Sequence, residues 1–112
     1  MANDFKNAIS VGVGTSDVSV YTAPPSKASI LIEVDVANKH TAAITASVKV
    51  QDTSNSSANA YLVKDAPIPV GGTLQAVAGQ KIVLEATDIV KVVSSVANSA
   101  DVVCSVLEDV NS

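Results

Sequence analysis

The chain has 112 residues, of which 47% are hydrophobic, 16% charged and 3% aromatic, and its formal net charge at pH 7 is −4. Plentiful apolar and few charged side chains exclude an intrinsically disordered chain. This length predicts one domain, spanning residues 1–112. Every basic residue is a lysine, so the guanidinium group that grips phosphate and guanine is missing and we expect no nucleic-acid partner.

The N-terminal segment predicts neither a signal peptide nor a membrane span. Its first ten residues are too polar for a signal peptide, and no window of the chain holds the roughly 18 apolar residues that cross a bilayer. We expect a soluble protein made in a cytoplasm. Residues 1–8 are a possible extended arm, and the first strands are predicted at residues 9–13 and 17–22.

The clearest signal is strict alternation of apolar and polar residues. It covers residues 28–37 and then residues 42–50, and a period of two is typical of strands with one buried face. We expect these two strands to pair as an antiparallel hairpin through residues 38–41.

Shorter runs continue the same pattern to the end of the chain. The polar segment at residues 52–59 is expected to be an exposed hairpin loop, and Pro67 and Pro69 predict an edge strand or a crossover, because proline donates no ladder hydrogen bond. Turn formers recur about every ten residues, so the sequence predicts an all-β fold: one antiparallel β-sandwich, jelly-roll-like, of about eight strands. The further runs are 60–64, 73–77, 81–86, 89–93 and 102–107.

Some of these strands carry apolar residues on both faces. Val83 alternates with Ile82 and Leu84, and Leu107 alternates with Val106. A two-layer domain covers only one face of each sheet, so we expect the second face to contact another subunit.

The N-terminal segment is a second candidate contact. Phe5 is an isolated aromatic residue in a polar stretch, with Ile9 shortly after it. Phe5 could equally be a lid on the core. Possible subunit or capsid contacts are therefore Phe5, Ile9, Val83 and Leu107.

The residues that carry chemistry are few and widely separated. His40 is expected in a solvated turn, and Cys104, the single cysteine, as a small buried side chain. These two residues provide no ligand spacing for a metal. Glu33 and Asp35 share one face of a strand, about 7 Å apart, which most often serves solubility. We therefore expect no enzyme, metal, cofactor or small-molecule substrate, the alternative being a small hydrolase that uses loop Asp or Ser residues.

Several short motifs, in this order, resemble small virion proteins of tailed phages. The resemblance spans residues 5–108 and rests on segments such as VYTAP at 20–24, SILI at 29–32, VKVQD at 48–52, YLVK at 61–64, PIPVGGTL at 67–74 and GQKIVL at 79–84. Proteins of this kind are compact β-sandwiches used as head decoration or cement proteins and as tail modules.

The resemblance implies a non-enzymatic structural role. We expect a capsid decoration (cement) protein on the phage head surface, bound to the major capsid protein as a homo-oligomer, with a trimer favoured. The alternative is a tail, baseplate or fibre module that docks a host glycan or another tail protein. An exposed Tyr21 or Tyr61 would favour that alternative.

Overall fold

The computed structural model describes residues 4–108, except for the side chains of residues 79 and 80. In this part of the chain there are eight strands and no helix, so no helix is present that could cross a membrane. The strands are β1 (Asp4–Val13), β2 (Val18–Thr22), β3 (Ser29–Asn38), β4 (Ile44–Asp52), β5 (Ala58–Ile68), β6 (Thr73–Leu84), β7 (Ile89–Ser94) and β8 (Ala100–Glu108).

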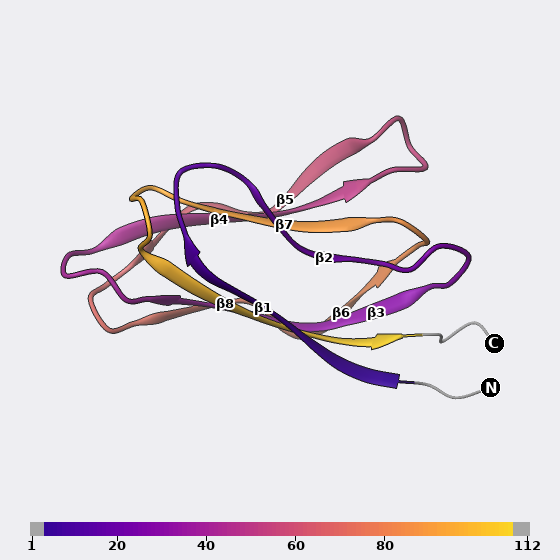
Figure 1. Ribbon diagram of the computed structural model, residues 1–112, viewed down its shortest axis with the longest axis horizontal. Helices are drawn as coiled ribbons and strands as arrows, with labels where there is room; N and C mark the ends of the chain where they lie inside the picture. The colour runs from indigo at the N-terminus through magenta and orange to yellow at the C-terminus, as the bar shows by residue number, and fades with distance from the viewer. Residues whose placement is uncertain (1–3, 109–112) are drawn as a thin grey trace.

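The eight strands form two four-stranded antiparallel sheets that pack face to face (Figure 1). The first sheet has the order β1-β8-β3-β6 and the second the order β2-β7-β4-β5. The chain changes sheet at every connection except the hairpin between β4 and β5, which is the arrangement of a jelly roll. The predicted antiparallel β-sandwich with jelly-roll character is confirmed.

The predicted hairpin between residues 28–37 and 42–50 is wrong. The strands themselves exist, as β3 and β4, but β3 pairs with β6 and β8 whereas β4 pairs with β5 and β7. The connection between them crosses from one sheet to the other. Alternation indicates a strand with one buried face and says nothing about which strand lies beside it, so a short polar connection was wrongly predicted to be a tight hairpin.

Two strand boundaries also differ from the prediction. The runs at 73–77 and 81–86 belong to one strand, β6, whose pairing with β3 changes register near Glu33 and again near Asp35. β1 begins at Asp4, so residues 4–8 of the predicted arm pair with β8. Residues 1–3 of that arm lie outside the described part of the chain.

The core between the sheets consists mainly of valine, with Tyr21 as its one aromatic residue among those described. Valine suits this position because branched side chains pack well on a pleated surface. Cys104 is fully buried here, as the sequence predicted. The largest fully buried side chains are Leu31, Ile68, Leu84, Val13, Val34, Val36, Val48, Val77, Val90, Val92, Val102 and Val106.

A buried polar cluster joins the two sheets where β1 begins and β8 ends. The Tyr21 hydroxyl of the second sheet donates to Glu108 Oε2 of the first sheet at 2.5 Å and lies 3.0 Å from Ser29 Oγ. Lys6 Nζ approaches the other Glu108 oxygen at 3.2 Å. The hydrogen bond from Tyr21, with the contribution of Lys6, holds the pKa of Glu108 below its usual value, while burial and Glu108 raise the pKa of Tyr21 to about 12.

Asn38 makes a second polar link at the opposite end of β3. Its Nδ2 donates to the backbone oxygens of Ala42, Ile68 and Pro69 at 3.0–3.2 Å, and its Oδ1 accepts from the His40 amide at 2.7 Å. One buried side chain therefore satisfies backbone groups within the crossover from β3 to β4 and at the end of β5.

Replacing Tyr21 with Phe should lower the free energy of unfolding by about 1–3 kcal/mol, because Glu108 and Ser29 lose a buried partner. Urea denaturation at pH 7 measures this difference. Since the pKa of Glu108 is lowered in the folded protein, this stabilisation is present at neutral pH and is lost as the pH falls through the lowered pKa. Tyr61→Phe, at a half-exposed ring, is the matched control and should change stability by less than about 0.5 kcal/mol. Equal stability of Tyr21→Phe and the unmodified protein would contradict the assignment.

Candidate functional site

One row of neighbouring side chains on the first sheet is entirely apolar. The row consists of Phe5, Leu107, Ile30 and Val83. The residues next to the last three in the chain, Val106, Leu31 and Leu84, are buried, so the row lies on the outer face, away from the second sheet. We call it the apolar row, and it runs across all four strands through the register pairs Phe5–Leu107, Leu107–Ile30 and Ile30–Val83.

The two ends of the apolar row are well exposed. Phe5 on β1 is 77% exposed and Val83 on β6 is 64% exposed. On the same outer face, the register pair Ile9 and Val103 adds further exposed apolar surface, at 63% and 42%. Scattered apolar residues are ordinary on a protein surface, whereas a row spanning a whole sheet is typical of an interaction site.

The structure brings the four predicted contact residues onto this one face. Phe5, Leu107 and Val83 are members of the apolar row, and Ile9 lies further along β1. Phe5 does not cover the core, since its ring is on the outer face. Sequence reasoning missed Ile30, because alternation with Val34 and Val36 suggested a core residue. The register shift between Leu31 and Glu33 instead puts Leu31 in the core and Ile30 on the outer face.

The outer face of the second sheet has a different character. One cross-strand row there contains Ser19, Lys91, Lys49 and Tyr61. Lys49 forms an ion pair with Asp17 at 2.7 Å, and its Nζ is 5.6 Å from the centre of the Tyr61 ring. The outer face of the first sheet thus carries a continuous apolar row beside polar residues, whereas this row of the second sheet is largely polar.

Glu33 and Asp35 bring their carboxyl groups together on the outer face of the first sheet, beside the apolar row. Both lie on the central strand β3, and their register partners are Ser105 and Val103 on β8. Burial, followed by contact with Glu33, raises the pKa of Asp35 to about 6. In the described structure Oδ1 of Asp35 is shielded from solvent and accepts no hydrogen bond, so the ionised form is poorly stabilised.

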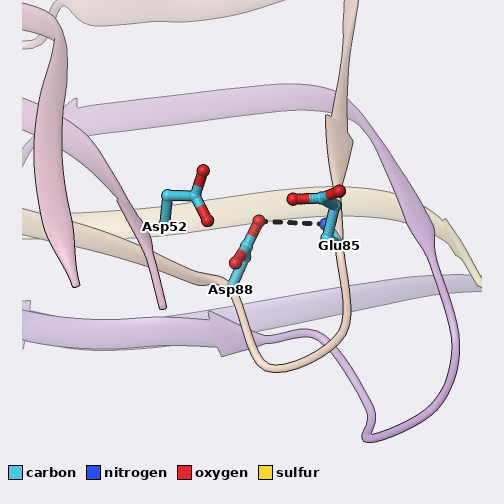
Figure 2. A group of neighbouring side chains, drawn as sticks. All are labelled: Asp52, Glu85 and Asp88. Carbon is cyan, nitrogen blue, oxygen red and sulfur yellow. Dashed lines mark hydrogen bonds between the residues drawn. The ribbon is translucent and has the colours of Figure 1, made fainter. Parts of the chain in front are cut away.

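Three other carboxylates converge at the open side of the sandwich between β5 and β6. Figure 2 shows Asp52, at the end of β4, facing Glu85 and Asp88 from the turn between β6 and β7. One oxygen of each lies within 4.8 Å of the others. Oxygen ligands at such spacing are the kind that hold calcium or magnesium.

The hydrogen bonds of these carboxylates give them a structural role. Asp88, 3% exposed, accepts from the backbone amides of Thr53 at 3.2 Å and Glu85 at 3.0 Å. Asp52 Oδ1 accepts from the amide and hydroxyl of Ser54 at 3.1 and 2.8 Å. The cluster therefore fastens the β4–β5 loop to the β6–β7 turn. Sequence reasoning missed it, because Asp52 is more than thirty residues from Glu85 and Asp88 and each of the three resembles an ordinary turn residue.

A cleft of about 510 Å³ lies beside this cluster. Apolar side chains from β4, β5 and β6 form its walls, with Asp52 and Glu85 at its polar side. The wall residues include Val50, Ala60, Leu62 and Ile82.

The residues considered for catalysis stay apart from this cleft. His40 lies in the connection between β3 and β4, where its amide donates to Asn38, and Cys104 is inside the core, where burial raises the pKa of its thiol to about 12. Among residues 4–108, neither joins a group of three His, Cys, Asp or Glu side chains.

Gly12 in β1 is a position that only glycine suits. Its φ is +72°, and a Cβ there would lie 2.3 Å from Asn98 Oδ1.

Comparison with known proteins gives no relative: no family model, no curated protein and no solved structure matches the chain.

Replacing Asp35 with Asn should stabilise the protein at pH 7.5 and have little effect at pH 4. Because the folded state raises the pKa of Asp35, folding becomes less favourable as the pH rises from the ordinary Asp value of about 4 to about 6. Solvent screening reduces the effect, so we expect a gain of about 1 kcal/mol at pH 7.5. Urea unfolding at the two pH values measures it.

Glu33→Gln is the matched variant for this pair. It removes the neighbouring charge and should lower the pKa of Asp35, which a carboxyl NMR titration measures directly. A stability gain from Asp35→Asn that is the same at pH 4 and pH 7.5 would show that ionisation is not its cause.

Proposed function

We propose that the protein is a non-enzymatic structural protein of a phage virion that decorates the head shell. In this proposal it binds the major capsid protein as a homo-oligomer and stabilises the shell. The observation that carries the proposal is the apolar row, which crosses the first sheet from Phe5 to Val83 and stays uncovered in the single chain. The motif order that resembles small virion proteins supplies the phage context.

The outer face of the first sheet suits docking better than catalysis. It is a broad sheet surface, and fully covering a side chain such as Phe5 or Val83 contributes roughly 1.5–3 kcal/mol. Several copies attached to one shell multiply such modest contacts into tight attachment.

Val83→Lys should reduce binding to head shells purified without this protein by at least tenfold. It places a charge at the exposed end of the apolar row, where a partner would have to desolvate it. Cosedimentation of labelled protein with the shells measures the affinity. Val93→Lys, on the outer face of the second sheet, is the matched control and should bind like the unmodified protein.

Two results would contradict this proposal. One is unchanged shell binding by Val83→Lys while circular dichroism shows an intact sandwich. The other is antibody labelling of tails and not of heads in electron micrographs of whole particles.

One observation favours a second candidate, a tail or fibre module that docks a host glycan. Tyr61 on β5 is 50% exposed, and the Nζ atoms of Lys49 and Lys64 lie 5.6 and 5.3 Å from the centre of its ring. An exposed aromatic ring with polar neighbours can stack on a sugar while the neighbours bind hydroxyl groups. An exposed Tyr21 or Tyr61 is the feature that, from the sequence, favours this alternative. Tyr21 is buried, whereas Tyr61 is half exposed.

For this second candidate, Tyr61→Ala should abolish binding to an array of host surface glycans, whereas Val83→Lys should leave it intact. If neither the unmodified protein nor Val83→Lys binds any glycan on the array, the second candidate is ruled out.

A further inference from the structure

Strand β1 is the sheet edge with the longest uninterrupted ladder in the described structure. The four edges of the two sheets are β1, β6, β2 and β5. β1 pairs with β8 at constant register over the seven residues from Asp4 to Ser10. No other described strand pairs with the opposite side of β1, so that side presents backbone donors and acceptors for a further strand.

The other three edges carry features that discourage pairing with another chain. β6 changes register twice against β3 and has Lys81 at φ 61°. β5 has Asp65 at φ 50° and ends near Pro67, while β2 is five residues long and shifts register next to Val20. Bulges, prolines and short length are the usual means by which sheet edges avoid association.

We propose that β1 pairs in antiparallel fashion with β1 of a second copy, about a two-fold axis at Asn7. Asn7 is the midpoint of the regular ladder, so this register uses all of it. It places Asn7 opposite Asn7 and Phe5 opposite Ile9, twice. The exposed side chains of Phe5 and Ile9, on the same outer face, then cover one another as an aromatic–aliphatic cross-strand pair.

The charges on β1 are compatible with a second copy as the occupant. In this register Lys6 stands opposite Ala8, and Asp4 opposite Ser10, so no like charges face each other directly. Lys6 keeps its ion pair with Glu108 of its own chain. A two-fold axis uses the same surface of both molecules, which is the commonest symmetry of homo-oligomers.

This pairing rests on the homo-oligomer in the proposed function and specifies how its subunits associate. It does not depend on the virion role. Two first sheets become one eight-stranded sheet whose outer face carries two apolar rows. The rows run in opposite directions from the junction of the two β1 strands and are offset by four residues along the strands, because Phe5 of one copy faces Ile9 of the other. The pair therefore offers two apolar rows to a shell, less the area of Phe5 and Ile9 that is covered at the junction. It is a dimer, whereas the sequence led us to expect a trimer, and the mass in solution separates the two.

The test is an engineered disulfide at the axis. Directly opposed residues on antiparallel strands have Cα atoms about 4.5–5.5 Å apart, within the range that a disulfide spans. Asn7→Cys is expected to give a covalent dimer under mild oxidation, read on a non-reducing gel. Val83→Cys, an exposed position on the opposite edge of the same sheet, should remain monomeric on the gel. Cys104 is buried and is expected to stay a thiol.

A second measurement uses the unmodified protein. Sedimentation equilibrium should show a monomer–dimer equilibrium, and Ile9→Glu, which places a charge opposite Phe5, should weaken it at least tenfold, while Val83→Glu leaves it unchanged. A strict monomer at high concentration, a trimer, or cross-linking of Val83→Cys in place of Asn7→Cys would each overturn the pairing. Because this test uses purified protein alone, its failure is distinguishable from failure to bind shells.

Discussion

The structure depends on apolar side chains at every second position of the strands, facing each other across two sheets. With Tyr21 as the only buried aromatic ring among the described residues, this interior is filled mainly by valine. Small branched side chains make a thin layer, so the sheets must lie close along their whole length. The first sheet adds a second constraint, because its outer face is also partly apolar and has no second layer over it. The candidate contact surface and the proposed self-pairing both follow from that uncovered face and its edge.

Polar groups between the sheets fix how the layers are joined. Tyr21 and Glu108 are 87 residues apart in the chain, yet they meet at one end of the sandwich. Asn38 fixes the crossover at the other end through backbone oxygens of the β5 end. An apolar interior tolerates small sliding movements, whereas directed hydrogen bonds have one geometry, so these two links favour one relative placement of the sheets.

The sequence allowed prediction of the fold class and of most strands, because alternating apolar residues are typical of strands with one buried face. It did not allow prediction of strand partners: β3 and β4 read as a hairpin but lie in different sheets. Glycine at position 79 suggested a break where β6 continues. Val83 and Leu107 were proposed as contacts because their strands carry apolar residues on both faces, and Phe5 and Ile9 because they are apolar residues in a polar N-terminal segment. Ile30 could be recognised only from the register. The meeting of Asp52, Glu85 and Asp88 depends on long-range topology and left no local pattern.

The pairing of Asp4 with Glu108 brings the two ends of the described chain next to each other. In Figure 1 β1 and β8 run side by side over most of their length. This ladder joins the most distant segments of the chain, so it is the most costly loop to close during folding. A circularly permuted chain, with these ends joined and the β4–β5 loop opened, would convert that closure into a local hairpin while exposing new ends far from the shared edge. Circular permutation would therefore change the point on the sandwich at which a second protein can be fused to the chain.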